Sequence, residues 1–178
     1  MNSSPGAYFV TICTQNREFM FGDISLGEMK LNDAAKMVAT IWDELPHNNP
    51  GIIIDEFVIM PNHIHGIIVI NKHVGARLVC AHDKNNTIEK WADMKPAPTL
   101  GDIICAFKSI TTNEYIIGVK ERGWKSFPGK LWQRNYYEHI IRDEDELNSI
   151  REYIVNNPLN WDIDTENPAF CASTNDAK

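Results

Sequence analysis

Two apolar segments joined by only two residues constrain the fold of this chain most strongly. Residues 52–60 and 63–70 are rich in isoleucine and valine, the β-branched residues that favour strands. Pro61 and Asn62 lie between them and form a turn signal. A link this short can only join neighbouring antiparallel strands. The sequence therefore predicts an antiparallel hairpin near the middle of the chain.

The other periodic segments extend this hairpin into a complete domain. Residues 7–14 and 131–141 read as strands, and residues 19–31 as a small hairpin. Helices are predicted from Asn32 to about Leu45, from Thr99 to about Ile117, and from Asp143 to Pro158. The order is strand, helix, strand, strand, helix, strand and an extra C-terminal helix. It predicts an α+β fold, a ferredoxin-like βαββαβ sandwich with one antiparallel sheet. Residues 1–160 would form a single domain, followed by a loose, polar, acidic tail at 161–178, while residues 71–98 would form a long surface loop.

Length and composition place the chain among ordinary globular proteins. It has 178 residues, 43% of them apolar, which is enough for one core without disulfides. The four cysteines are far apart and form no CxxC pair, so we expect reduced thiols in a cytoplasmic protein. No apolar run is long enough to span a membrane, and the N-terminal segment does not resemble a secretion signal.

The charge is unevenly distributed along the chain, although the net charge is −7. Residues 105–142 carry 7 basic and 3 acidic side chains, whereas residues 143–178 carry 2 basic and 9 acidic ones. A locally basic segment on an acidic protein can still contact phosphates. The same pattern is also compatible with a solvated surface of mixed charge, because net charge says little about partners.

His63 and His65 form the first candidate site. On a strand, residues i and i+2 point to the same face, so the two imidazoles would stand side by side while Ile64 points into the core. Such a pair can hold a metal ion. The alternative is two surface histidines on a half-exposed strand, and the short HxH pattern alone does not decide between them.

Tyr153 and Asn157 form the second candidate site. Their i, i+4 spacing places them on one helix face. Alternatively, Tyr153 is an edge-of-core tyrosine and Asn157 simply ends the helix. Because Pro158 follows, we expect Asn157 to be pushed away from helical angles.

A third feature is the alternation of basic and aromatic residues in 131–139, with the sequence LWQRNYYEH. Such a strip can stack bases and follow a phosphate backbone. An ordinary β-strand with aromatic packing would have the same pattern.

These three features together resemble the REP-associated tyrosine transposases, a family that combines a His-apolar-His motif with one tyrosine. The resemblance rests on residues 61–66 (PNHIHG), 132–142 (WQRNYYEHIIR) and 153–158 (YIVNNP), with support from 98–109, and covers roughly residues 7–160. Position 157 is Asn, where some wider relatives carry Gln.

The resemblance implies a nuclease and strand transferase. His63, His65 and Asn157 would bind Mg²⁺ or Mn²⁺, and Tyr153 would attack the DNA phosphate and form a 5′-phosphotyrosine bond. Lys108, Arg134, Tyr136 and Arg142 would contact single-stranded or hairpin DNA, whose sequences in this family are palindromic repeats. The chain would act as a monomer or a homodimer, and in a dimer Tyr153 could serve the partner's histidines.

Two other functions remain open on sequence grounds. One is a domesticated module that binds DNA hairpins without cutting them. The other is a nucleotide phosphoester hydrolase of the histidine-triad type, although that pattern requires a further histidine at the position of Ile67.

Overall fold

The computed structural model describes residues 5–71 and 98–170. Its centre is a four-stranded antiparallel sheet with the order β4-β5-β1-β6. The strands are β1 (Gly6–Cys13), β4 (Ile52–Ile59), β5 (His63–Ile70) and β6 (Tyr137–Ile141). The predicted hairpin is therefore confirmed as β4 and β5. The smaller hairpin is also present, as β2 (Gly22–Ser25) and β3 (Glu28–Leu31).

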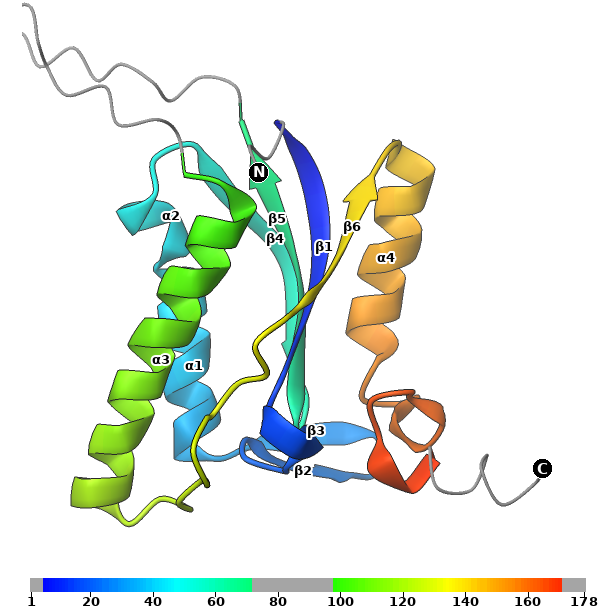
Figure 1. Cartoon of the computed structure of the whole chain (residues 1–178). Helices are drawn as coiled ribbons and strands as arrows, with labels where there is room; N and C mark the ends of the chain where they lie inside the picture. The colour runs from blue at the N-terminus through cyan, green and yellow to red at the C-terminus, as the bar shows by residue number, and fades with distance from the viewer. Residues whose placement is uncertain (1–4, 72–97, 171–178) are drawn as a thin grey trace, which may run out of the picture.

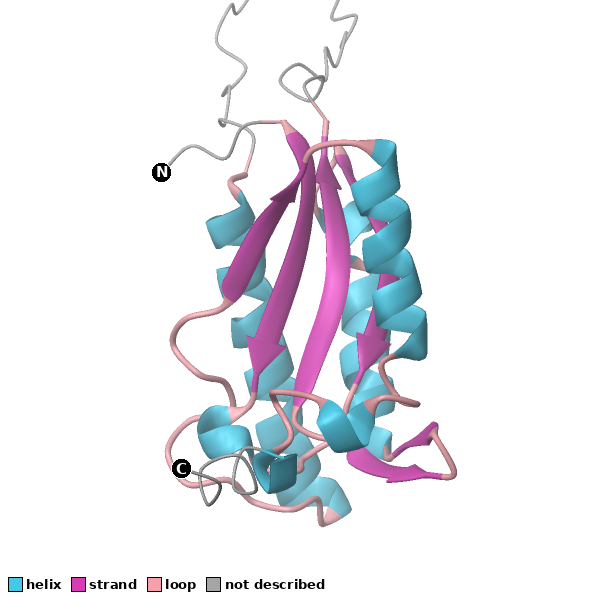
Figure 2. Cartoon of the chain, turned by 90° about the vertical axis from the view of Figure 1, so that its right-hand side faces the viewer, coloured by secondary structure: helices cyan, strands magenta, loops and turns pink. Residues whose placement is uncertain are grey.

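The helices cover both faces of the sheet (Figure 1). On one face lie α1 (Asp33–Asp43), α2 (Leu45–Asn48) and α3 (Leu100–Arg122), and on the other lies α4 (Glu144–Asn156). Figure 2 shows α4 running along the sheet on its own side. This arrangement is the predicted ferredoxin-like sandwich with an extra C-terminal helix. Two short 3-10 helices, Gln15–Arg17 and Trp161–Ile163, lie near one end of the sheet.

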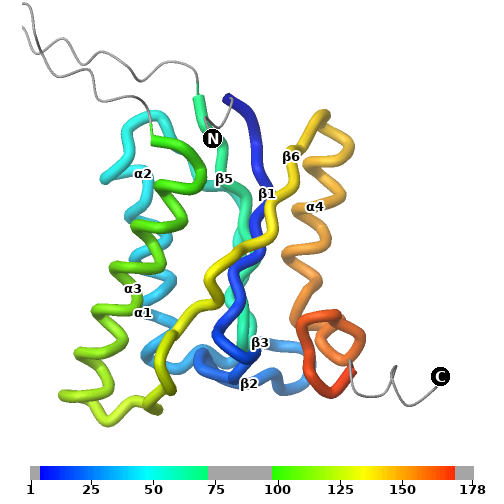
Figure 3. The backbone as a smooth tube through the Cα atoms, viewed as in Figure 1, coloured from blue at the N-terminus to red at the C-terminus, as the bar shows by residue number. Residues whose placement is uncertain are grey.

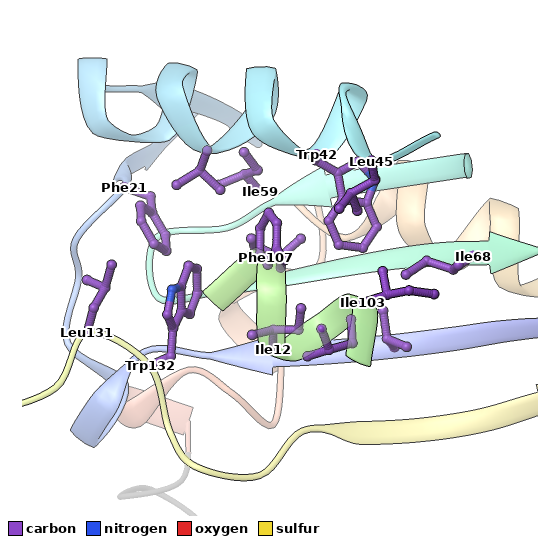
Figure 4. Close-up of a cluster of buried hydrophobic side chains, with 14 of the residues drawn as sticks. Ile12, Phe21, Trp42, Leu45, Ile59, Ile68, Ile103, Phe107, Leu131 and Trp132 are labelled. Atoms are coloured by element: carbon purple, nitrogen blue, oxygen red, sulfur yellow. The ribbon is translucent and has the colours of Figure 1, made fainter. Parts of the chain in front are cut away.

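The main hydrophobic core fills the space between the sheet and helices α1 and α3 (Figure 4). Val10 and Ile12 of β1 point into it, as does Ile64 of β5, and all three are fully buried. The Trp42 ring packs edge-on against Phe107, with ring centroids 5.3 Å apart. Gly66 leaves room for this packing, because a Cβ there would lie 2.4 Å from the Trp42 ring.

A second, smaller core lies beneath α4. It joins Ile67 of β5 and Ile141 of β6 to Ile154 of the helix, and Leu147 and Ile150 pack against it. Leu147, Ile150 and Ile154 recur at helical spacing on one face of α4. An ion pair adds to the docking of α4, since Arg151 donates two hydrogen bonds to Asp55 at 2.6 and 2.8 Å. Asp55 lies where the register between β4 and β5 shifts.

We expect Arg151→Ala to lower the urea midpoint of unfolding modestly at neutral pH. The hydrogen bond from Arg151 lowers the pKa of the Asp55 carboxyl. The contribution of this ion pair to the free energy of unfolding is therefore present above the ordinary aspartate pKa of about 3.9. It is lost as pH falls through the lowered pKa of Asp55. Urea unfolding of the wild type and of Arg151→Ala is measured at neutral pH, where this contribution is present, and near pH 2, where we expect it to be lost. An equal difference in urea midpoint between the two proteins at both pH values would contradict the prediction. Arg134→Ala, at an exposed position, is the control.

Two element boundaries differ from the sequence expectation. Helix α3 continues to Arg122 instead of ending near Ile117, and Gly123 caps it in the left-handed conformation. Gly118 lies within the helix, and its missing side chain makes room for Trp124, whose ring would lie 2.1 Å from a Cβ. Strand β6 begins only at Tyr137, and Figure 3 traces the irregular path that leads to it from α3.

The segment after α4 is more ordered than a loose tail. Trp161, Asp164 and Asn167 are all buried, and the Asn167 side chain donates a hydrogen bond to the Trp161 carbonyl oxygen at 2.9 Å. Residues 161–170 therefore pack against the domain, which the polar composition of this stretch concealed. Most of the predicted loop at 71–98 lies outside the described residues. Among the helices that the structure describes, none is long and apolar enough to cross a membrane.

Candidate metal and tyrosine site

His63 and His65 project from β5 toward the α4 side of the sheet. Their Nε2 atoms are only 3.0 Å apart, which confirms that the two imidazoles share a face. Both side chains are buried, with exposed fractions of 0% for His63 and 3% for His65. The alternative of two surface histidines is therefore wrong, because α4 and the segment after it cover this face of the strand.

The hydrogen bonds of Asn62 fix the tautomer of His63. The Asn62 amide nitrogen donates to two backbone carbonyl oxygens, those of Arg17 and Glu166. Its amide oxygen must then be the atom that faces His63 Nδ1 at 2.8 Å. An amide oxygen only accepts, so Nδ1 carries the proton and Nε2 of the neutral ring presents a lone pair. Metal-binding histidines are commonly held in this way.

His65 is held by two neighbours on β1. Its Nδ1 lies 2.9 Å from the Thr11 hydroxyl oxygen, and the Phe9 ring stacks on it with centroids 5.3 Å apart. A hydroxyl oxygen can accept a hydrogen bond from Nδ1–H, which leaves the lone pair of Nε2 available to bind a cation. Phe9 and Thr11 alternate along β1 with the core residues Val10 and Ile12, so strand geometry delivers both contacts.

Burial keeps both rings uncharged at neutral pH. It lowers the pKa of His63 to about 3, with a smaller contribution from the positive charge of Arg17. Burial also places the pKa of His65 well below its ordinary value, with repulsion from His63 as a second cause. Neutral imidazoles are the form that binds metal ions.

Tyr153 reaches this pair from helix α4 of the same chain. Its hydroxyl oxygen lies 3.2 Å from His65 Nε2, and its ring meets Phe9 edge-on. Tyr153 is 45% exposed and lines a pocket together with His65. Burial raises the pKa of Tyr153 to about 12, and the negative charge of Asp164 contributes in the same direction.

Asn157 lies one turn beyond Tyr153 and is 1% exposed. Its backbone remains helical, with φ −57° and ψ −42°, so the expected displacement before Pro158 does not occur. The amide nitrogen donates to Asp164 Oδ2 at 3.1 Å. The amide oxygen is buried and has no hydrogen-bond partner among the described residues. Such an orphaned acceptor is costly unless a cation or another donor meets it.

Asp164 is a site residue that sequence reasoning missed. Its Oδ2 lies 3.8 Å from His63 Nε2, and ligand atoms of His63, His65 and Asp164 all lie within 4.8 Å of one another. The three groups could therefore hold a metal ion. No periodic pattern marks Asp164, since it follows the last helix in a polar stretch, and only the buried Trp161 hints that this stretch packs.

The donors fit a divalent cation. Ligand atoms of His63, His65 and Asp164 converge in one buried place. The Asn157 amide nitrogen is hydrogen-bonded to Asp164 there, and the Asn157 amide oxygen has no hydrogen-bond partner among the described residues. Mixed nitrogen and oxygen donors of this kind suit ions such as Mn²⁺ or Mg²⁺. Each of these atoms offers a lone pair, and a cation would satisfy all of them at once.

A pocket of about 380 Å³ opens beside Tyr153 and His65. Phe9 and Thr11 line it from the sheet, and the loop before β6 and the segment after α4 line its sides. Its lining includes three tyrosines, Tyr136, Tyr137 and Tyr153, and Arg17 as a cation. Aromatic rings with a nearby cation offer the contacts that an unpaired nucleotide uses.

The four predicted DNA contacts do not all gather at this pocket. Tyr136 lines it, and its hydroxyl donates to Glu138 at 3.0 Å. Arg134 lines a second pocket of about 330 Å³. Arg142 is exposed next to the first turn of α4, at the opposite end of that helix from Asn157.

Lys108, the fourth predicted contact, holds the protein's own loop. Its ammonium group donates to the carbonyl oxygens of Gln133 and Asn135 at 2.9 and 3.0 Å and lies 3.4 Å from that of Arg134. The Tyr136 ring lies under the same ammonium, 5.5 Å from it. These bonds turn residues 133–135 away from strand geometry, which explains why β6 is shorter than predicted.

We expect Lys108→Met to loosen this loop rather than only weaken DNA binding. The substitution keeps the aliphatic stem but removes the charged donor from the carbonyl oxygens, at a cost of about 1–2 kcal/mol in unfolding free energy. Hydrogen exchange should accelerate at residues 133–136. Lys120→Met, on an exposed position of the same helix, is the control. Unchanged exchange together with lost DNA binding would show instead that Lys108 contacts DNA.

Comparisons with known proteins show a relative of the chain and a solved structure of similar fold. No protein-family model matches the chain. An uncharacterized protein of Haemophilus influenzae (strain ATCC 51907 / DSM 11121 / KW20 / Rd) is 40% identical over 168 residues, which cover 90% of this chain and 84% of that protein. The structure is also similar to that of a REP-associated tyrosine transposase bound to a REP hairpin, with a TM-score of 0.54, 15% identity, and coverage of 90% of this chain and 71% of the other.

The TM-score of 0.54 establishes a shared fold with the transposase, and at 15% identity the comparison shows the fold alone. The resemblance that the sequence motifs predict is confirmed at that level. The 40% identity to the Haemophilus protein, over most of both chains, establishes common family membership. The chain therefore belongs to one family with this Haemophilus influenzae protein and has the fold of the REP-associated tyrosine transposase.

Proposed function

We propose that this protein cleaves and rejoins single-stranded or hairpin DNA through a covalent bond to Tyr153, as a metal-dependent transposase-type enzyme. The observation that carries this proposal is the position of the Tyr153 hydroxyl, 3.2 Å from His65 Nε2 within one chain. Tyr153 and His65 line one pocket. His63 lies directly beside His65, and the buried Asn157 amide oxygen has no hydrogen-bond partner among the described residues. The solved structure of similar fold is bound to a REP hairpin, which supports a DNA hairpin as the substrate class.

In this proposal His63, His65 and Asn157 hold Mg²⁺ or Mn²⁺. A bound divalent ion supplies positive charge that polarises the scissile phosphate. The chain's own residues prepare the site for it. Asn62 and Thr11 orient the two imidazoles. Asp164 accepts a hydrogen bond from the Asn157 amide nitrogen, which leaves the amide oxygen available.

The reaction is a transfer of one phosphodiester bond. The Tyr153 oxygen bonds to phosphorus, and the bond from phosphorus to the 3′ oxygen of the preceding nucleotide breaks. The phenol proton passes to solvent, and the departing 3′ oxygen takes up a proton to become a 3′-OH. The 5′-phosphotyrosine bond conserves the phosphodiester, so attack by another 3′-OH rejoins the strand without ATP.

The raised pKa of Tyr153 indicates what activation this step requires. With a pKa of about 12, the hydroxyl remains protonated at neutral pH. A nearby positive charge favours the phenolate and so opposes the effects of burial and of the Asp164 charge on the Tyr153 pKa. In this proposal Tyr153 is therefore a poor nucleophile until a cation binds nearby.

The test is a search for the covalent intermediate. The full chain is incubated with a single-stranded oligonucleotide that contains a REP-type hairpin, with Mn²⁺ or with a chelator. We expect an adduct that survives denaturation, requires the metal, and maps by mass spectrometry to Tyr153. Hairpin binding without an adduct in any divalent metal would contradict the proposal and favour a binding module that cuts nothing.

A further inference from the structure

The segment that follows α4 folds back onto the histidine pair and delivers a carboxylate there. Asp164 is 7% exposed, and its Oδ2 lies 3.8 Å from His63 Nε2. The same oxygen accepts the hydrogen bond from the Asn157 amide at 3.1 Å. Asp164 therefore adjoins two of the groups assigned above to the metal.

This position is imposed by contacts that do not involve the Asp164 side chain. Glu166 forms an ion pair with Arg17 at 2.8 Å, and the Glu166 carbonyl oxygen accepts a hydrogen bond from Asn62 at 2.8 Å. Trp161 stacks on His63, with ring centroids 6.1 Å apart. Residues on both sides of Asp164 thus anchor the segment to the elements that also hold the histidines.

The two carboxylate oxygens of Asp164 make different contacts. Oδ1 accepts the backbone N–H of Glu166 at 2.6 Å, which fixes the orientation of the carboxylate. Oδ2 is then directed toward Asn157 and His63, and a carboxylate oxygen has capacity for a second interaction besides one hydrogen bond. The carboxylate is oriented before any ligand binds.

Charge gives Asp164 a role that the other three groups lack. Two neutral imidazoles and an amide carry no net charge, so Asp164 contributes the one formal negative charge among the four. Hard divalent cations favour carboxylate oxygens over neutral donors. Removal of this charge should therefore weaken metal binding more than the loss of a hydrogen bond would.

We propose that Asp164 is itself a ligand of the metal ion held by His63 and His65, so that the segment after the tyrosine helix completes the metal centre. The proposal rests on the metal site of the proposed function and names one more residue of it. It also assigns a role to residues 161–167, which would close the centre from the side opposite the sheet.

The experiment measures Mn²⁺ binding to the full, metal-free chain without DNA, by calorimetry and by electron paramagnetic resonance. Asp164→Asn keeps the shape of the side chain but removes its charge, and we expect at least about a 100-fold weaker affinity, the upper end of what loss of an outer partner costs. Asp162→Asn, at an exposed position two residues earlier, should bind like the wild type. Asp164→Glu should recover part of the loss.

A second variant gives a direct signature of coordination. With Co²⁺, Asp164→Cys should show a thiolate-to-metal charge-transfer band in the near ultraviolet, and Asp162→Cys should not. Circular dichroism of the metal-free variants checks that each one is folded.

Wild-type affinity in Asp164→Asn, or no charge-transfer band in a folded Asp164→Cys that still binds Co²⁺, would overturn the proposal. Failure of the wild type to bind Mn²⁺ would overturn both this proposal and the metal site on which it rests. Metal binding that depends on Asp164, in a chain that forms no DNA adduct, would support the ligand assignment and contradict only the proposed reaction.

Discussion

Tyr153→Phe is expected to reduce formation of the covalent DNA adduct by at least about a thousandfold, because it removes the only atom that can bond to phosphorus at this position. The ring should remain in place, since its contacts with Phe9 and His65 are made by the aromatic face and edge. Single-turnover incubation with hairpin DNA and Mn²⁺, analysed on denaturing gels, measures the effect. Mn²⁺ affinity should change little, because the hydroxyl group is not among the proposed ligands.

The matched control for this variant is Tyr137→Phe. Tyr137 is another exposed tyrosine on the same side of the sheet, and its ring also meets Phe9 edge-on. We expect Tyr137→Phe to retain the adduct. An adduct that persists in Tyr153→Phe and disappears in Tyr137→Phe would show that Tyr137, and not Tyr153, is the nucleophile. Adducts in both variants would indicate that another residue is the nucleophile.

Trp132→Ala is expected to destabilise the fold by about 3–5 kcal/mol, the usual cost of removing a large aromatic side chain from a core. Trp132 was a candidate for base stacking within the basic and aromatic run. The structure instead buries it, with 4% exposed, where its ring packs against Phe21 and Phe107 and its Nε1–H donates to Thr111 at 2.9 Å. Thermal unfolding should occur roughly 10 °C lower than in the wild type.

Trp132→Phe separates packing from hydrogen bonding. It keeps most of the buried ring and removes only the indole N–H, so we expect a loss of about 1–2 kcal/mol. At a temperature where each variant is folded, hairpin affinity should remain near that of the wild type. Full stability with lost hairpin binding would contradict the burial of Trp132 and restore it as a DNA contact.

The sequence by itself determined the elements whose signals are local. The two-residue link between residues 60 and 63 permits only an antiparallel hairpin, and β-strand geometry then places His63 and His65 on one face. Helix periodicity likewise puts Tyr153 and Asn157 on one face of α4. These relations depend on neighbours within a few residues, and the structure confirms each of them.

The tertiary structure decided everything that depends on groups distant in sequence. The bonds from Lys108 to its own loop could not be predicted, because a lysine in a basic segment carries no mark of the carbonyl oxygens it binds 25 to 27 positions away. Gly118 looked like a helix end because nothing nearby reveals that the Trp124 ring needs its space. Asp164 looked like part of an acidic tail because its neighbours, His63 and Asn157, come from separate elements. Only the folded chain brings the histidines, the tyrosine, the Asn157 amide and this carboxylate together, since the burial of polar groups and long-range hydrogen bonds leave no periodic trace in the sequence.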